Sequence, residues 1–296
     1  EYVNQDYILH KLGRPHRAIG IMYTYYPHDK QWPQRISKAC KDMNITFQWD
    51  YPYDDYFPFN ADGQPWEQMR DIRRHGQDVA LTLTLDCSLS DDELREVARM
   101  LRPYGRMTIR INHECSGTWF THNKRFTYEQ VGKFFAHFSD IIHQEAPNVR
   151  TVFCAGFAQA DGKLEKEDEL AVAYRAADVW SADCYLALHY GWPYDVAEVG
   201  GGQYKADSVG MYYDLFRRTY ERASSQFGAK PLVTAEFNTD GDVTGPRHQG
   251  ESVIRFAEAF RDHQADWFKA ISLYQFRDRG RLGLEIEDPN NPAVGI

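Results

Sequence analysis

Short apolar runs rich in β-branched residues alternate with longer amphipathic segments along the whole chain. The runs are apolar at nearly every position, as in strands that are covered on both faces, and the segments between them repeat apolar residues at helical spacing. Eight runs predict strands: Ala18–Tyr23, Ile45–Trp49, Val79–Leu85, Met107–Ile111, Val149–Ala155, Val179–Tyr185, Pro231–Phe237 and Ala270–Phe276. Seven segments predict helices: Trp32–Met43, Pro65–Arg74, Asp91–Leu101, Tyr128–Glu145, Leu170–Ala177, Val209–Gln226 and Glu251–His263.

The order of these elements indicates an α/β protein of the (β/α)8 TIM-barrel type. Strands that alternate with helices pair in parallel, and eight such units are enough to close a barrel. A doubly wound open sheet is the alternative, but no glycine-rich phosphate-binding loop follows the first strand. We expect a single domain over residues 1–296, with an N-terminal extension at 1–17 and an irregular C-terminal segment at 279–296.

Polar side chains gather where the predicted strands end. Asn112, His113 and Glu114 directly follow one strand, and Glu236 lies at the end of another. In a barrel of this type, the carboxyl ends of the strands form the face that carries the active site. Further candidates near these ends are Tyr25, Trp49, Arg110, Trp119, Tyr185, His189, Trp192, Asn238 and Tyr274.

Charge and hydropathy narrow the classes of partner. The 296 residues carry a net charge of -9, and no block of five basic residues occurs, so we expect neither nucleic acid nor an anionic membrane as a partner. No apolar run reaches the roughly 18 residues that predict a membrane span. No signal peptide is visible, but a leader could precede Glu1, so we expect a secreted or cell-surface protein, with a cytoplasmic one as the alternative. A monomer is expected.

Aromatic residues and cysteines add two further constraints. Aromatic residues make up 15% of the chain and cluster in segments that are predicted to be loops. Core packing accounts for most single rings, whereas the clustering favours a cleft for sugars, which present an apolar face and a hydroxylated edge. The five cysteines are odd in number and form no CxxC pair, so free thiols are expected, with a bridge between Cys115 and Cys154 left open.

Two glutamates at strand ends supply the groups that glycoside hydrolysis requires. One carboxyl group must be protonated to donate to the leaving oxygen, and the other must be ionised to attack the anomeric carbon or to activate water. The aromatic pair Trp119 and Phe120 could exclude water from Glu114 and keep it protonated. Arg110 and the Tyr185 hydroxyl could hold Glu236 ionised.

Residues 110–120, R-I-N-H-E-C-S-G-T-W-F, resemble the Arg-x-x-His-Glu-x-x-Gly-x-Trp-Phe stretch of glycoside hydrolase family 26. Ala182-Asp183-Cys184-Tyr185 is similar to the Asp-x-Tyr sequence on strand six of that family, and Pro231–Phe237 is similar to its nucleophile strand. The family belongs to clan A, a set of retaining (β/α)8 enzymes, and consists chiefly of β-mannanases with some β-1,3-xylanases and β-glucanases.

The resemblance implies a role for four residues. Glu114 would be the acid/base, Glu236 the nucleophile, His113 a substrate contact near the cleavage point, and Tyr185 a hydrogen-bond donor to the nucleophile. The chain departs from the family where Tyr274-Gln275-Phe276 replaces the usual tryptophan of strand eight. It departs again where Thr121-His122-Asn123 replaces aromatic residues.

We therefore expect a retaining endo-β-glycoside hydrolase that acts on a plant or microbial polysaccharide, with β-1,4-mannan as the first choice and β-glucan or β-xylan as alternatives. Retention predicts carboxyl groups roughly 5–5.5 Å apart, and a gap above about 6.5 Å would indicate inversion. A metal-dependent sugar isomerase, with His113, Glu114, Asp183 and Glu236 as ligands, and a non-catalytic carbohydrate-binding barrel are less favoured. No cofactor and no metal are expected. Substrate contacts are expected from Arg110, Asn112, His113, Trp119, Tyr25, Trp49, Tyr185, His189, Trp192, Asn238 and Tyr274.

Overall fold

The structure is a computed structural model that describes residues 2–32, 35, 38, 63–117, 120–156, 162–186, 188–190, 196–198, 208–239, 246–276 and 284. The chain divides into two compact units. The N-terminal unit comprises Tyr2–Gly156 and Glu165–Trp180, and the C-terminal unit comprises Glu1, Phe157–Leu164 and Ser181–Ile296. The single domain expected from the sequence therefore stays a prediction.

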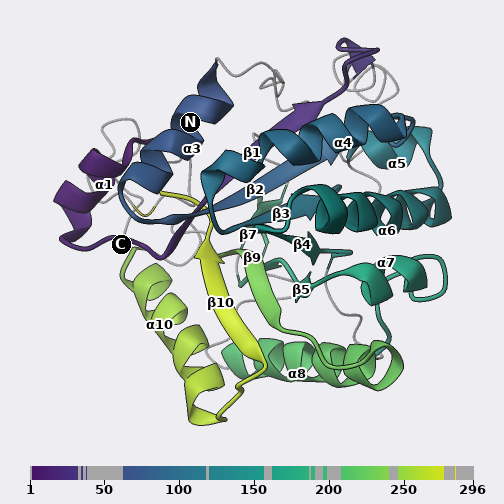
Figure 1. The fold of residues 1–296 in the computed structure, drawn as a ribbon. Coiled ribbons are helices and arrows are strands. Elements are labelled where there is room, and N and C mark those ends of the chain that lie inside the picture. Colours follow the sequence, from purple (N-terminus) through teal and green to yellow (C-terminus); the bar gives the residue numbers. More distant parts are fainter. Residues whose placement is uncertain are drawn as a thin grey trace. The chain divides into compact units, whose positions relative to one another are not determined.

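Parallel strands form the centre of the N-terminal unit (Figure 1). They are β1 (Ala18–Tyr25), β2 (Asp78–Leu85), β3 (Met107–Ile111), β4 (Val149–Phe153) and β5 (Val179–Ser181), and they neighbour one another in that order. β1 pairs directly with β2, from Ala18 opposite Asp78 to Tyr25 opposite Leu85. The predicted strand Ile45–Trp49 and most of the predicted helix Trp32–Met43 lie outside the described residues.

Helices alternate with the strands of the N-terminal unit. Those at predicted positions are α3 (Gln64–Arg74), α4 (Asp91–Met100), α6 (Tyr128–Glu145) and α7 (Ala171–Ala176). The sequence did not predict α1 (Gln5–Leu12), α5 (Thr121–Arg125) or the short 3₁₀ helix at Arg102–Tyr104. Ser90 and Thr127 each form a capping box, so α4 and α6 begin where the sequence signals a start. In α6 the apolar stripe is buried, and Phe135 packs edge-on against Phe153 of β4 at 4.9 Å between ring centroids. Side-chain packing therefore holds the helices to the strands.

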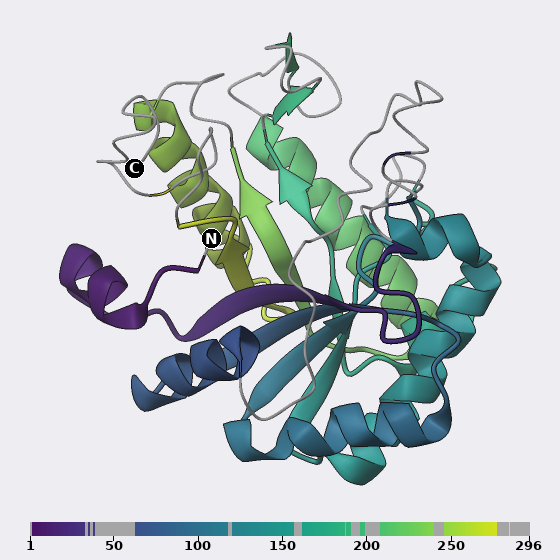
Figure 2. The same ribbon diagram turned by 90° about the horizontal axis from the view of Figure 1, so that it is seen from above.

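The C-terminal unit repeats the pattern of parallel strands with helices. Its elements are β6 (Cys184–Tyr185), β7 (Leu188–Tyr190), β8 (Val196–Glu198), α8 (Ser208–Phe227), β9 (Leu232–Asn238), α10 (Pro246–Asp262) and β10 (Phe268–Leu273). β9 pairs in parallel with β6 and with β10, whereas β7 and β8 form an antiparallel pair. α8 and α10 carry an aromatic core in which Phe256 stacks on Phe237 at 4.0 Å and meets Phe216 edge-on. Figure 2 shows α8 and α10 beside β9 and β10.

The structure corrects one predicted strand. The run Val179–Tyr185 is not continuous, because it forms β5 up to Ser181 and resumes as β6 at Cys184. Between them, the amide of Ala182 donates to the Val233 carbonyl, and the Asp183 carboxylate accepts from the amide of Glu236. A side chain thus replaces a backbone acceptor at this point, and the ladder is interrupted.

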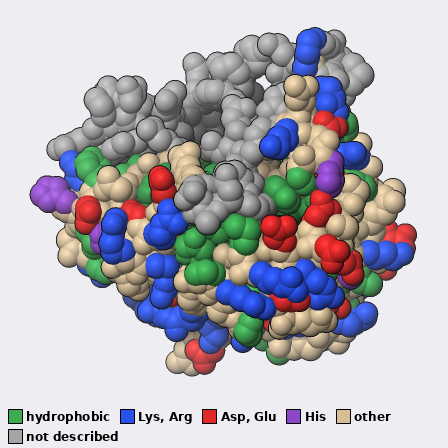
Figure 3. Space-filling view, turned by 45° about the horizontal axis from the view of Figure 1, so that its top comes forward, with side chains coloured by type: hydrophobic (Ala, Val, Ile, Leu, Met, Phe, Trp, Pro, Cys, Tyr) green, Lys and Arg blue, Asp and Glu red, His purple; other side chains and the backbone are tan. Residues whose placement is uncertain are grey.

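Charged side chains of both signs are interspersed over the described surface in the view of Figure 3. Among the described helices, none has the length and apolarity that crossing a lipid bilayer requires. Cys87, Cys115, Cys154 and Cys184 are free thiols, so the bridge left open between Cys115 and Cys154 is not formed.

Candidate active site

Glu114 lies in a tight turn at the carboxyl end of β3. Asn112 and Glu114 both have left-handed backbone conformations, with φ of 45° and 50°, which non-glycine residues adopt at a cost and which often occur at functional sites. Three backbone hydrogen bonds hold the turn: Asn112 N to Leu83 O at 3.2 Å, Ser116 N to Ala155 O at 2.8 Å and Gly117 N to Glu114 O at 3.1 Å. The strained turn places a partly exposed glutamate directly after a largely buried strand.

Asn112 is part of the scaffold of this turn. Its Oδ1 accepts from the amide of Leu85 at 2.7 Å, and its Nδ2 donates to the Leu85 carbonyl at 3.3 Å. The side chain thus pairs with Leu85 as a strand backbone would, and it is buried. Its amide is engaged in holding β2 and β3 together, which favours the structural role over the predicted substrate contact.

His113 belongs to a buried cluster of three rings, in which it is tilted by 51° to Phe120. Its ring centroid lies 4.3 Å from that of Phe120, and Phe120 stacks almost parallel to His122 at 5.7 Å. Burial, and then the positive charge of Arg110, lowers the pKa of His113 well below its usual value, so the imidazole is neutral. Arg110 is itself buried and donates through Nε to the Thr82 hydroxyl at 2.9 Å.

His122 has an unusual environment that the sequence did not reveal. It is fully buried, and within the described part of the chain neither ring nitrogen has a hydrogen-bond partner. Burial lowers the pKa of His122 to about 3. The neutral ring stacks on Phe120. A separation of two residues in the sequence did not predict this contact.

Two further strand ends of the N-terminal unit carry polar groups. Asp86 follows β2, is buried, and is held by the amide and hydroxyl of Ser88 and by Arg125 at 3.0 Å. Tyr25 ends β1 half-buried, and burial followed by the charges of Glu93 and Glu96 raises its pKa. Asp86 is therefore an anchor for α5, and Tyr25 remains a predicted substrate contact.

Glu236 is held from two sides in the C-terminal unit. The Tyr185 hydroxyl donates to Glu236 Oε2 at 2.6 Å, as the resemblance implied, and Asp183 Oδ1 accepts from the Glu236 amide at 3.0 Å. Both carboxylates are buried. Burial, and then the adjacent Glu236 carboxylate, raises the pKa of Tyr185 well above its usual value, so the phenol stays a proton donor. The arrangement orients one oxygen of a carboxylate at the end of a parallel strand.

Asn238 and Tyr274 lie close to Glu236 in the same unit. Asn238 is two residues after Glu236 and fully buried, and its Nδ2 donates to the Tyr274 carbonyl at 2.6 Å. The Tyr274 ring lies edge-on to that of Tyr185, at 6.1 Å between centroids. Gln249 of α10 bonds to Asn238, a contact that the sequence did not suggest, because a glutamine within a helix carries no such signal.

Several predicted contacts lie outside the described residues. Trp49, Trp119 and Trp192 are among them, as is the side chain of His189. Glu114 belongs to the N-terminal unit and Glu236 to the C-terminal unit, so the predicted separation of their carboxyl groups stays a prediction.

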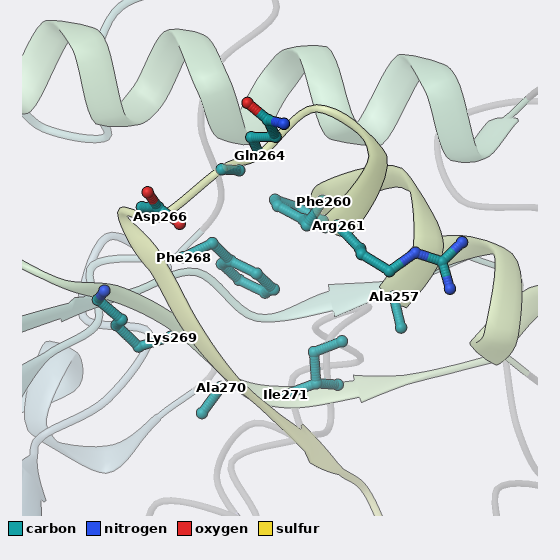
Figure 4. A pocket seen from close by; sticks show the side chains of 10 residues that line it. Ala257, Phe260, Arg261, Gln264, Asp266, Phe268, Lys269, Ala270 and Ile271 are labelled. Carbon is teal, nitrogen blue, oxygen red and sulfur yellow. The ribbon is translucent and has the colours of Figure 1, made fainter.

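A hollow of about 620 Å³ lies between α10 and β10 of the C-terminal unit (Figure 4). Apolar side chains such as Phe260, Phe268 and Ile271 line it, together with Arg261 and Lys269. None of the predicted site residues is among its lining residues. The hollow therefore does not coincide with the predicted catalytic residues, which lie at the strand ends.

Comparison with known proteins identifies the fold. No protein-family model and no curated protein matches the chain. Among solved structures, the catalytic domain of the major endoglucanase from Xanthomonas campestris pv. campestris is 14% identical, with a TM-score of 0.52 over 96% of this chain and 82% of that one. A family 86 glycoside hydrolase in complex with neoagarooctaose is 11% identical, with a TM-score of 0.51 over 89% of this chain and 46% of that one.

These matches show the fold. They confirm the expected (β/α)8-barrel class and, at the level of the fold, the resemblance to glycoside hydrolases. A family 26 β-mannanase from Bacteroides ovatus also matches, at 13% identity and a TM-score of 0.44 over 76% of this chain. The chain spans only 63% of the length of that mannanase and 31% of a Bacteroides uniformis β-glucuronidase.

Proposed function

We propose that the protein is a retaining glycoside hydrolase that cleaves a β-linked polysaccharide. The observation that carries the proposal is the hydrogen bond from Tyr185 to Glu236, 2.6 Å long, at the end of β9. A buried carboxylate that accepts from a phenol, on a backbone that is itself held by the Asp183 carboxylate, has one oxygen in a defined direction, as a nucleophile requires. The barrel class of the fold agrees with this chemistry.

In the first step, Glu236 attacks the anomeric carbon and Glu114 donates its proton to the leaving glycosidic oxygen. The bond to that oxygen breaks, and a glycosyl ester forms on Glu236. In the second step, ionised Glu114 takes a proton from water, and the resulting nucleophile displaces Glu236 from the anomeric carbon. Two inversions give net retention, and both carboxyl groups return to their starting states.

Neighbouring residues would support these two steps. Neutral His113, buried beside Phe120, would be the contact to the sugar near the cleavage point. Tyr185 keeps its proton and so remains a donor to Glu236 throughout. Asn112 would act indirectly, by holding the turn that presents Glu114.

The substrate that we propose first is β-1,4-mannan, because residues 110–120 resemble the family 26 motif. β-Glucan and β-xylan are the alternatives, since Tyr274-Gln275-Phe276 replaces the tryptophan that the family usually has on strand eight. Aromatic residues near the strand ends suit stacking on sugar faces in an open cleft.

The test is reducing-end release from mannan, glucomannan, xylans, mixed-linkage β-glucan and β-1,3-glucan, with wild type, Glu236→Ala and Glu114→Ala. We expect one polymer to be cleaved and both variants to lose at least about a thousandfold in kcat/KM. On an aryl glycoside whose leaving group needs no proton, added azide should rescue Glu236→Ala as an α-glycosyl azide and Glu114→Ala as a β-glycosyl azide, which separates the two roles. Full activity of Glu236→Ala would remove it as the nucleophile, and binding without turnover by wild type would support the carbohydrate-binding alternative.

A further inference from the structure

Gln249 of α10 is fully buried near the end of β9. Its Nε2 donates to the Thr239 carbonyl at 3.0 Å and to Asn238 Oδ1 at 3.4 Å. The orientation of this amide is determined by its partners, because a carbonyl oxygen can only accept. Gln249 therefore presents its donor end to the last turn of the strand that carries Glu236.

The Asn238 amide is determined in the same way. Its Oδ1 also accepts from the amide of Thr239 at 2.8 Å, and its Nδ2 donates to the Tyr274 carbonyl at 2.6 Å. A flipped Asn238 amide would place its NH2 group against the N–H donor of Thr239, so only one orientation satisfies the partners. Asn238 thus ties the end of β9 to the residue that follows β10.

Tyr274 is held at both ends of its backbone. Its amide donates to the Phe237 carbonyl at 3.0 Å, and its carbonyl accepts from Asn238. With the backbone fixed, the ring meets Tyr185 edge-on at 87° between ring planes, a favourable aromatic geometry. Tyr185 is also the register partner of Asn238 across the pair of β6 and β9, and its hydroxyl reaches Glu236.

We propose that Gln249 is a positioning residue for Glu236, because its hydrogen bond to the Thr239 carbonyl, with a longer one to Asn238 Oδ1, holds the strand end from which Asn238 reaches the Tyr274 carbonyl. This inference rests on the proposed function in one respect, because the proposed function is what assigns a catalytic role to Glu236. Gln249 acts through the Tyr274 ring and the Tyr185 hydroxyl. Replacing Gln249 removes two hydrogen bonds from the strand end and lets these rings shift relative to the carboxylate.

The chain offers a matched control in Gln77. This glutamine is also buried, at 2% exposed, and its Nε2 donates to a backbone carbonyl, that of His16, at 3.1 Å. It precedes β2, at the opposite end of a strand from the candidate residues. Gln77→Met and Gln249→Met each remove a side-chain amide from a buried site. A loss of stability that comes only from removing a buried amide should therefore appear in both variants.

The first measurement follows the Tyr185 phenol and needs no substrate. The protein is labelled with ¹³C-tyrosine, and the NMR signal of Tyr185 Cζ is assigned as the one that disappears in Tyr185→Phe. Its chemical shift is then followed from pH 7 upward. We expect Tyr185 to titrate at a lower pH in Gln249→Met than in wild type, since a phenol that shifts becomes less buried and moves away from the negative carboxylate. Gln77→Met should match wild type. If Gln249→Met also matched wild type, the positioning role would be excluded.

The second measurement is a double-mutant cycle in kcat and KM on the cleaved polymer. We expect Gln249→Met to lower kcat about tenfold with KM unchanged, but to lower it less than about twofold when Tyr185→Phe is already present. Equal effects in both backgrounds would show that Gln249 does not act through Tyr185. Activity of Glu236→Ala would overturn the proposed function instead, and the NMR result would still decide the geometric inference.

Discussion

The Tyr185 hydroxyl and the Glu236 carboxylate, from strands β6 and β9, form a hydrogen bond of 2.6 Å. The backbone amide of Glu236 also donates to the Asp183 carboxylate at 3.0 Å. The break between β5 and β6 is what makes the second contact possible, since Asp183 occupies a gap in the ladder. An interruption of regular structure thus fixes the side chain to which we assign the nucleophilic role.

Tyr185→Phe tests the first of these contacts. A hydrogen bond to a charged group contributes about 1.5–3 kcal/mol, so we expect kcat to fall about 10- to 100-fold with little change in KM. Steady-state kinetics on the cleaved polymer measure this. Tyr212→Phe is the control, because its hydroxyl donates to the Tyr185 carbonyl at 3.4 Å, a long hydrogen bond that does not involve Glu236, and it should change kcat less than about twofold.

Asn112→Ala tests the scaffold role of the side chain that pairs with Leu85. The change leaves a buried amide and a buried carbonyl of Leu85 without these partners, so we expect about 2–4 kcal/mol of lost stability. Urea unfolding measures the difference. Asn148→Ala also removes two bonds, to the carbonyls of Leu101 and Gly105, but at a partly exposed site where water can replace them, and about 1 kcal/mol is expected. Equal losses would contradict the scaffold role.

His122 predicts loss of stability in acid. Burial lowers its pKa from 6.5 to about 3, so the unfolded chain binds a proton between these values and the folded chain does not. The contribution of His122 to stability is therefore complete above pH 6.5 and decreases as the pH falls toward 3. His122→Phe keeps a ring beside Phe120 and removes the titrating group. We expect its urea midpoint to fall less steeply between pH 6.5 and 4 than that of wild type.

If His122→Phe and wild type had the same pH dependence, His122 would have a polar partner in solution and its pKa would not be lowered.

Gly156→Ala tests how the end of β4 supports the turn that carries Glu114. Gly156 has φ of 148°, and an added Cβ would lie 2.7 Å from the Ser116 hydroxyl oxygen. We expect a loss of about 1–3 kcal/mol and lower kcat, since Ser116 must move. Gly76→Ala is the control, with φ of 74° and open space around the added carbon. Ser116→Ala should restore part of the loss in Gly156→Ala and none in Gly76→Ala, and thermal unfolding together with kinetics would show it.

Much of the fold was readable from the sequence. The runs Met107–Ile111 and Val79–Leu85 are apolar at almost every position and form buried parallel strands, and the helical stripe with a Thr127 cap forms α6 as expected. These features depend on neighbours within a few residues, so local patterns are enough to predict them. The placement of Glu114 after β3 and of Glu236 near the end of β9 follows from the same patterns.

The sequence by itself thus determined the order of elements and the chemistry available at the strand ends. Only the tertiary structure decided which polar groups are engaged elsewhere. Asn112 pairs with Leu85 across 27 positions, and Asn238 holds Tyr274 across 36. Whether an amide faces a ligand or a neighbouring backbone depends on groups that are distant in the chain, because buried donors and acceptors must find partners wherever folding brings them.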